Sequence, residues 1–338
     1  MIKEMLARLA EGEHLARLDC ESFIRSVAVG DVSDAQVAAF LTGLKAKGET
    51  VEEVAGCVLA LRASMQRVEH TRTMVFDCCG TGGDGTGSFN FSTAASLIVA
   101  ACGIPTAKHG NRAVSSSCGS ADLFEASGVK IDLTAQQAAR LLDDIGYCFL
   151  FAPVYHTATK KVAEVRRQLG FRTLFNLIGP LLNPAVATHQ MIGTPNSRVA
   201  SLLAEVSRAV GDNRVFTFYN SCGFDEILPT GLTMVHSSTH STSKALPLQL
   251  PSHLANGNDP HDFQGGDRVH NAAILKGILD GDESPFLQVS LLNAAFGLTV
   301  AGLTDNLDEA FRIAHDSVSS GRTRRLFDQY RSATQAIS

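Results

Sequence analysis

The chain has 338 residues, of which 45% are hydrophobic and 19% are charged, and its formal net charge is −5. This composition predicts a folded chain of about two domains and excludes a disordered one. The acidic balance argues against a nucleic-acid binder, and no apolar run is long enough to span a membrane. The eight cysteines form no CxxC pair, and the first residues lack the apolar stretch of a secretory signal. We therefore expect reduced thiols in a cytoplasmic protein.

The first 66 residues carry only helix patterns, with capping boxes at Ser33 with Gln36 and Thr50 with Glu53. From residue 74, strand and helix patterns alternate. Strands are expected at 74–79, 104–108, 147–152, 191–193 and 215–219, and helices at 92–101, 134–145, 156–169 and 198–210. This alternation predicts an α/β fold: a small all-helical N-terminal domain, residues 1–70, and a larger α/β domain, residues 71–338, with a mostly parallel central sheet.

The last third of the chain contains one irregular stretch followed by helices. Residues 236–262 are rich in Ser, Thr, His, Pro and Asn, and we expect an exposed excursion whose histidines, His236 among them, are solvated. Three helices are expected near 268–279, 285–303 and 307–333.

A glycine-rich loop, Gly80 to Ser88, follows the first expected strand and leads into a helix. Glycine lets backbone N–H groups approach an anion closely, and a helix N-terminus favours negative charge. The loop therefore suits a phosphate or pyrophosphate, although a flexible turn would also explain its glycines. Asp84 and the polar run from Asn90 to Thr93 favour the phosphate interpretation. The loop is not a Walker A loop, because no Gly-Lys-Ser/Thr ends it.

Three further groups suit an anionic substrate that carries a metal ion. The run Lys108-His109-Gly110-Asn111-Arg112 offers cations and an amide after the second strand. Asp225-Glu226 suits a hard cation such as Mg²⁺ that is shared with substrate phosphates. Arg166, ten residues after His156, suits a substrate carboxylate. Each group taken alone is also typical of a solvated surface. Together they predict a Mg²⁺-dependent enzyme that acts on a pyrophosphate-bearing substrate and has a cationic second pocket.

Several motifs, in a fixed order along nearly the whole chain, resemble those of the anthranilate phosphoribosyltransferase family. They are Asp77-x-x-Gly-Thr-Gly-Gly-Asp84, Asn90-x-Ser-Thr93, Lys108-His-Gly-Asn-Arg112, Gly119-Ser-Ala-Asp122, Arg172-Thr-x-Phe-Asn176, Gly179-Pro-Leu-x-Asn-Pro184 and Asp225-Glu226. The resemblance implies transfer of a phosphoribosyl group from phosphoribosyl pyrophosphate (PRPP) to the amine of anthranilate, in tryptophan biosynthesis. It also implies that the chain returns to the helical domain at about 158–185, and that two copies form a homodimer through their helical domains.

The resemblance also implies a role for each group of residues. PRPP would be bound by Gly80, Thr81, Gly82, Gly83, Asp84, Ser88, Asn90, Ser92, Thr93, Lys108 and Ser120. Mg²⁺ would be held by Ser92, Asp225 and Glu226, and anthranilate would lie beside Gly80, His109, Asn111, His156, Arg166 and Pro180. No single catalytic base is expected, because the aromatic amine is neutral and nucleophilic at pH 7.

Two departures from the family pattern keep an alternative acceptor open. Cys118 stands where a serine is common, and Thr159 stands where a larger residue is common. The alternative is therefore a related phosphoribosyltransferase that acts on another aromatic amine or acid. A pyrimidine-nucleoside phosphorylase would carry a different phosphate loop. A regulatory nucleic-acid-binding module would have lost this loop and gained a basic groove.

Overall fold

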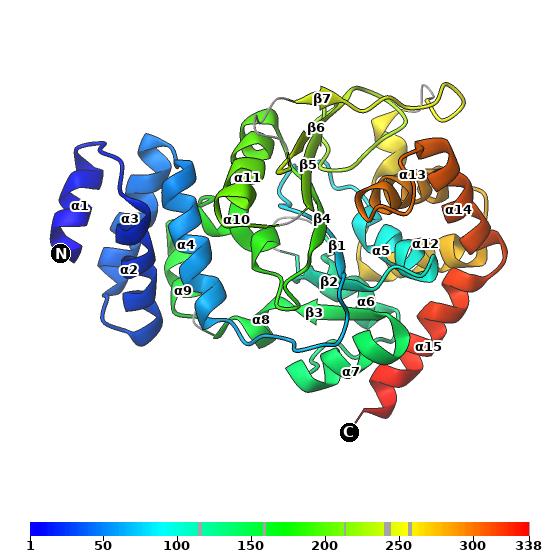
Figure 1. The fold of residues 1–338 in the computed structure, drawn as a ribbon, viewed down its shortest axis with the longest axis horizontal. Helices are drawn as coiled ribbons and strands as arrows, with labels where there is room; N and C mark the ends of the chain where they lie inside the picture. Colours follow the sequence, from blue (N-terminus) through cyan, green and yellow to red (C-terminus); the bar gives the residue numbers. More distant parts are fainter. Residues whose placement is uncertain (114–116, 158–159, 213, 240–244, 256–258, 338) are drawn as a thin grey trace.

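Four helices at the N-terminus lie at one end of the molecule, as Figure 1 shows. The computed structural model describes residues 1–113, 117–157, 160–212, 214–239, 245–255 and 259–337. The four helices are α1 (Ile2–Ala10), α2 (Arg17–Val29), α3 (Asp34–Lys47) and α4 (Val51–Ser64). Both expected capping boxes are present, since Ser33 accepts from the Gln36 N–H and Thr50 accepts from the Glu53 N–H. The all-helical N-terminal region is confirmed.

The central sheet has seven strands in the order β3-β2-β1-β4-β5-β6-β7. The strands are β1 (Phe76–Gly80), β2 (Thr106–Gly110), β3 (Tyr147–Phe151), β4 (His189–Gly193), β5 (Arg214–Asn220), β6 (Thr233–Ser237) and β7 (Leu246–Pro247). β1 to β5 pair in parallel, whereas β6 and β7 are antiparallel. The mostly parallel sheet is therefore confirmed. The strand order reverses between β1 and β4, which is where open α/β sheets bind ligands, beyond the carboxyl ends of the strands.

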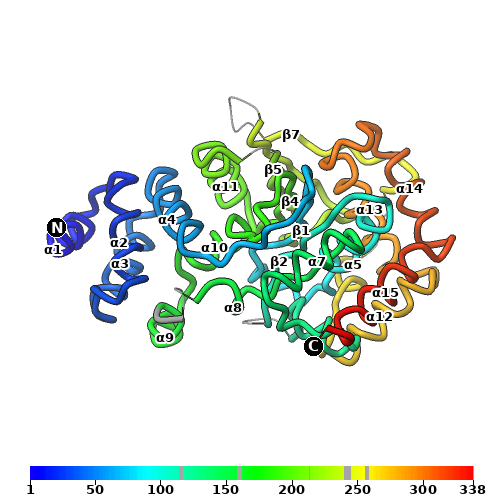
Figure 2. Tube along the Cα trace, turned by 60° about the horizontal axis from the view of Figure 1, so that its bottom comes forward, coloured from blue at the N-terminus to red at the C-terminus, as the bar shows by residue number. Residues whose placement is uncertain are grey.

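Alternate residues of the central strands point into two different hydrophobic cores. Cys78 and Met191 lie in the core that includes α5 (Phe91–Ala101) and α13 (Pro285–Val300). Their neighbours Cys79 and Ile192 lie in the core that includes the N-terminal helices and α11 (Ser197–Ala209). Successive strand residues face opposite sides of a sheet, so both faces are covered by helices. Figures 1 and 2 show the sheet between the N-terminal helices at one end and the C-terminal helices at the other.

The remaining described elements include the segment between β3 and β4 that leads the chain back to the N-terminal helices. They are α6 (Ser120–Ala126), α7 (Ala135–Ile145), α8 (Ala152–Tyr155), α9 (Lys160–Leu169), α10 (Phe175–Ile178), the 3₁₀ turns η2 (Gly179–Leu182) and η3 (Pro260–Phe263), α12 (Arg268–Asp280), α14 (Leu307–Ser319) and α15 (Arg322–Ala336). Val162, Leu174 and Ile178 are buried in the core of the N-terminal helices. None of the described helices is long and apolar enough to cross a membrane.

Three expected features differ in the structure. The structure gives α9 as Lys160–Leu169, whereas the expected helix began at His156, which instead ends the short helix α8 with φ −114° and ψ 60°. The last expected helix is two helices, since Gly321 (φ 73°) separates α14 from α15. The expectation of a wholly exposed 236–262 segment with a solvated His236 was wrong: β6 pairs with β5 through His236 opposite Thr217, and this histidine is only 4% exposed.

Candidate active site

Glycines end three parallel strands at the point where the strand order reverses. Gly80 of β1 pairs with Gly193 of β4, and Gly110 ends β2. A Cβ on Gly80 would lie 2.4 Å from Asp225 Oδ2, and a Cβ on Gly193 would lie 1.8 Å from the Asp225 carbonyl oxygen. Only glycine therefore lets the loop that carries Asp225 rest on the ends of these two strands.

Gly193→Ala is expected to lower the free energy of unfolding by about 3 kcal/mol, because the new methyl group overlaps backbone that cannot yield easily. Urea unfolding of the variant measures this loss. Gly179→Ala is the matched control, because a Cβ there would meet nothing within 4 Å and the residue has an ordinary φ of −47°. Equal stabilities of the two variants would show that the Asp225 loop is not held against the strand end.

The loop from Gly80 to Ser88 is held at both ends and leaves its middle exposed. Gly82 and Gly83 have φ values of 64° and 71°, and both are exposed. The Gly82 N–H donates to Asp225 Oδ2 at 3.1 Å. At the far end, the Gly265 N–H donates to the Gly87 carbonyl at 2.9 Å. The loop thus presents its glycines to solvent beside Asp225.

Asp225 and Glu226 form a buried acidic pair beside the first turn of α5. Glu226 Oε1 accepts from the Ser92 N–H at 3.2 Å, and the Asn293 side chain holds the backbone N–H and carbonyl of the next residue, Ile227. Burial, and then the neighbouring Asp84, raises the pKa of Asp225 to about 7. Burial, and then Asp225, raises the pKa of Glu226 as well. Both carboxylates would therefore be stabilised by a cation.

The donor set at this pair fits Mg²⁺ only if the substrate completes its coordination. Among the described residues, no group of three His, Cys, Asp or Glu side chains is placed to hold a metal ion. Mg²⁺ is commonly bound by one or two carboxylates together with water and substrate phosphates. Asp225, Glu226 and the Ser92 hydroxyl match that requirement, and the glycine loop beside them suits the phosphates.

Lys108 is a buried cation behind the site rather than part of a solvated loop. It lies within β2, is 2% exposed, and donates from Nζ to the Cys78 carbonyl at 2.6 Å and to Ser92 Oγ at 3.2 Å. Its charge acts on two buried acids, Asp77 and Glu226, and favours their ionised forms. The buried amine thus joins β1, β2 and the start of α5.

Asn90 and Ser120 lie at the starts of two helices beside the ends of β1 and β2. Asn90 donates to the Cys118 carbonyl at 3.0 Å and accepts from the Asn271 amide at 3.0 Å. Ser120 Oγ would lie 2.2 Å from a Cβ on Gly110, so this helix start packs directly on the strand end. Thr93 is buried in the first turn of α5. The structure therefore gathers the residues expected to bind PRPP around the ends of these two strands.

Arg112 is not available as the second cation that the sequence suggested. Its guanidinium pairs with Asp122 at 3.0 Å and with Glu125 at 2.5 Å, and it lies over the Phe151 ring. Asn111, its neighbour, is exposed. Of the two cations expected in this run, only Lys108 therefore remains without a salt bridge.

His109 and His156 lie side by side, with ring centroids 5.2 Å apart, and both are buried. Burial, and then His156 and Lys108, lowers the pKa of His109 to about 3. Burial also lowers the pKa of His156 to about 4. Both imidazole rings are therefore neutral near pH 7. A neutral imidazole suits an aromatic ligand better than a charged imidazolium would.

The free energy of unfolding is expected to fall as the pH drops from about 6.5 toward 4. Unfolded histidines take up protons near pH 6.5, whereas folded His109 and His156 do so only near 3 and 4. Protons therefore favour the unfolded chain across this window, by about 2 kcal/mol for each histidine at pH 5. Urea unfolding at pH 8 and at pH 5 measures how much stability is lost on acidification. For His109→Gln, this loss in the free energy of unfolding should be about 2 kcal/mol smaller than for the wild type. His156→Gln should reduce the same pH-dependent loss of stability by a similar amount.

Arg166 and Pro180 lie on the returning segment between β3 and β4. Arg166 is half-buried on α9 with its guanidinium 5.5 Å from the Phe175 ring centroid, and burial lowers its pKa. Within the described part of the chain it pairs with no carboxylate. The Pro180 carbonyl accepts from Gln190, which also donates to Asp77. Thr159, whose small side chain bears on the choice of acceptor, lies outside the described residues.

Sequence reasoning missed two residues that position the site. Arg172 donates from Nη2 to the Gly82 carbonyl at 2.6 Å, although these residues lie 90 positions apart. Asn293 holds the loop that follows Glu226. Arg172 opens one of the motifs quoted above, and an asparagine inside an apolar helix is the only sequence signal for Asn293.

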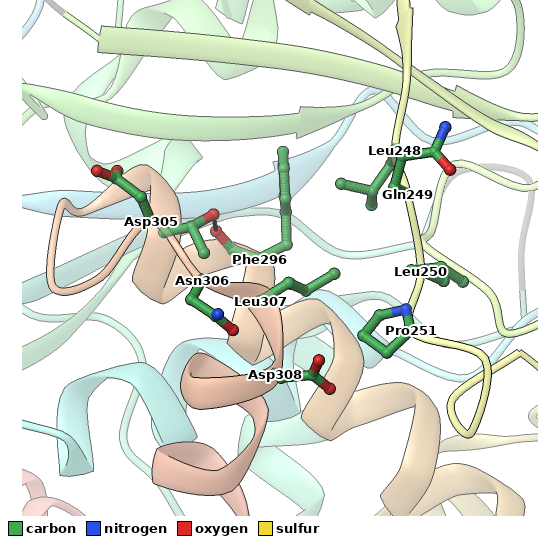
Figure 3. A pocket seen from close by; sticks show the side chains of 10 residues that line it. Leu248, Gln249, Leu250, Pro251, Phe296, Asp305, Asn306, Leu307 and Asp308 are labelled. Atoms are coloured by element: carbon green, nitrogen blue, oxygen red, sulfur yellow. Dashed lines mark hydrogen bonds between the residues drawn. The ribbon is translucent and has the colours of Figure 1, made fainter.

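A surface cavity lies apart from this site. It has a volume of about 540 Å³ and lies between residues 248–251 and the ends of α13 and α14 (Figure 3). Asn306, one of its polar lining residues, already caps α14 through the Glu309 N–H. None of the residues that line this cavity is among those expected to bind PRPP, Mg²⁺ or anthranilate.

Comparisons with known proteins agree with this architecture. Two family models match in order: "Glycosyl transferase family, helical bundle domain" over residues 3–65, and "Glycosyl transferase family, a/b domain" over residues 72–324. The anthranilate phosphoribosyltransferase of Moorella thermoacetica is 40% identical over 95% of each chain. The crystal structure of the Thermus thermophilus enzyme superposes with a TM-score of 0.91 at 34% identity, covering 98% of this chain and 99% of that one.

A Saccharomyces cerevisiae anthranilate phosphoribosyltransferase in complex with PRPP and Mg shares the fold, with a TM-score of 0.91 at 24% identity over 99% of this chain and 98% of that one. The matches to family models and relatives extend over nearly the whole length, and they agree with the motifs and with the arrangement at the strand ends. The chain belongs to the anthranilate phosphoribosyltransferase family.

Proposed function

We propose that the protein transfers the phosphoribosyl group of PRPP to the amine of anthranilate, giving N-(5-phosphoribosyl)anthranilate and pyrophosphate, in tryptophan biosynthesis. One observation carries this proposal. The exposed glycine loop and the buried acidic pair are held together at the strand ends, by the bonds from Gly82 N to Asp225 and from Ser92 N to Glu226. A pyrophosphate and its cation need these two features side by side.

PRPP is the substrate on the β1 and β2 side of the site. Gly80, Thr81, Gly82, Gly83 and Asp84 form the loop around its pyrophosphate, and Ser88, Asn90, Ser92, Thr93, Lys108 and Ser120 complete its site. The exposed backbone of Gly82 and Gly83 offers N–H groups to the leaving anion without a side chain in the way. Fixed donors of this kind stabilise charge that develops as the bond to ribose C1 breaks.

Mg²⁺ is the cofactor, held by Ser92, Asp225 and Glu226. When bound, it would neutralise charge on the departing pyrophosphate. The acidic pair is already fixed in position, because Asn293 holds the backbone that follows it and the Ser92 N–H holds Glu226. The site therefore needs little rearrangement to take up the ion with its substrate.

Anthranilate is the acceptor, beside Gly80, His109, Asn111, His156, Arg166 and Pro180. The Arg166 guanidinium holds the carboxylate, so that the amine is directed toward ribose C1. The neutral rings of His109 and His156 line the route without adding charge. No residue acts as a strong base, because the amine attacks in its neutral form.

Loss of anthranilate fluorescence on mixing the protein with PRPP and Mg²⁺ tests the proposal, with EDTA as the control. Metal-dependent loss, together with release of pyrophosphate, supports it. PRPP binding by calorimetry without consumption of anthranilate would instead support the related enzyme that uses another aromatic amine or acid. If the protein neither binds PRPP nor consumes anthranilate, the phosphoribosyltransferase proposal is overturned.

We further propose the organisation of the chain and its assembly. Residues 1–70 form the helical domain, which the chain rejoins at about 158–185, and residues 71–338 form the α/β domain. The burial of Val162 and Leu174 among the N-terminal helices supports this return.

A homodimer through the helical domains would cover Leu18 and Val29 of α2, which are 74% and 71% exposed. Free cysteines among the described residues support a cytoplasmic location.

A further inference from the structure

Arg172 contacts the middle of the glycine loop, although the two lie 90 positions apart in the chain. It lies between α9 and α10, in a segment that is held by the bond from the Thr173 N–H to Asn176 and by the buried side chain of Leu174. Its Nη2 donates to the Gly82 carbonyl at 2.6 Å. A Cβ on Gly83 would lie only 1.1 Å from its Nη1, so the guanidinium occupies the space beside the loop that a side chain at Gly83 would need.

No acid of the described residues balances the charge of Arg172. Among the described residues, none of the salt bridges involves this guanidinium, whereas Arg112, Arg167 and Arg198 each pair with a carboxylate. A guanidinium carries five N–H donors in a planar fork, and the bond to Gly82 uses only one of them. A partly exposed cation with spare donors therefore lies against the loop assigned to pyrophosphate.

We propose that Arg172 is a further residue that binds and positions the pyrophosphate of PRPP, an inference that rests on the proposed function. One donor fixes the loop through the Gly82 carbonyl, and the remaining donors face the anion that the same loop holds. A guanidinium suits this double role, because its fork contacts two oxygens of a phosphate group while keeping its bond to the backbone.

Arg172→Ala is expected to raise the KM for PRPP and the Kd for PRPP by roughly tenfold to a hundredfold, the range for a lost charged hydrogen bond. Inhibition by added pyrophosphate should weaken in parallel, while kcat and the KM for anthranilate change less than about threefold. Arg172→Lys should recover part of the affinity, because it keeps the charge but loses the fork. Arg167→Ala is the matched control: Arg167 is exposed, lies nearby on α9 and pairs with Glu164, so its loss should change none of these values.

Two glycine variants separate binding from a general disturbance of the loop. Gly83 and Gly85 have similar φ values of 71° and 78°, so alanine strains the backbone equally at both positions, but only a Cβ at Gly83 meets Arg172. Gly83→Ala should therefore raise the KM for PRPP more than Gly85→Ala in the wild-type protein. In the Arg172→Ala background this difference should shrink, because the part of it that comes from the clash with Arg172 is then lost.

Three outcomes would overturn the inference. In the first, the PRPP affinity of Arg172→Ala lies within twofold of that of Arg167→Ala. In the second, Arg172→Ala weakens the binding of anthranilate and not of PRPP. In the third, removing Arg172 leaves the difference in KM between the two glycine variants unchanged. Failure of the proposed function is a different result, because the wild-type protein itself would then neither bind nor consume PRPP.

Discussion

The double variant Asp225→Asn, Glu226→Gln is expected to lower kcat by roughly a thousandfold. Its two substitutions remove the carboxylates that would hold the cation at the leaving group. The amides keep the shape of the site. An Asn at 225 can still accept from the Gly82 N–H, and a Gln at 226 can still accept from the Ser92 N–H. Steady-state rates measured against Mg²⁺ concentration check the prediction.

The stability of this double variant is the control. Both carboxylates are buried beside one another and beside Asp84, and this environment raises the pKa of each. Neutral amides should therefore leave the metal-free protein at least as stable as the wild type in thermal unfolding. Wild-type turnover in a folded double variant would show that the metal is bound elsewhere.

Arg166→Ala is expected to raise the KM for anthranilate roughly a hundredfold, because a charged pair with the substrate carboxylate is lost. The Kd for PRPP should change less than about twofold, since Arg166 lies on α9 and stacks on Phe175 rather than on the glycine loop. Fluorescence titration with anthranilate and calorimetry with PRPP measure the two effects separately.

An acceptor without a carboxylate sharpens the Arg166 prediction. If this residue binds the carboxylate, aniline should be an equally poor acceptor for the wild type and for Arg166→Ala. Arg167→Ala again serves as the control on the same helix, because its side chain is exposed and pairs with Glu164. A parallel rise in the KM for PRPP and the KM for anthranilate would instead indicate a structural role for Arg166.

Local sequence signals predicted the elements well, because their causes lie within a few residues. The expected capping boxes at Ser33 and Thr50 are each closed by a side chain three positions later, and both are present. The helix expected at 134–145 is α7, which ends at Ile145 because Gly146 follows it with a φ of 81°. Errors arose where a helix was extended through a break, as at Gly321 and at His156.

The sequence by itself determined the fold class, the glycine loop, the acidic pair and the family, because motif order and hydrophobic period are properties of the chain alone. The tertiary structure decided the surroundings of each side chain. His236 is buried because β6 pairs with β5, Arg112 is neutralised by acids on α6, and Arg172 meets Gly82 from 90 positions away. These contacts join segments that are distant along the chain. Burial, charge balance and access to the site therefore follow only once the sheet has brought those segments together.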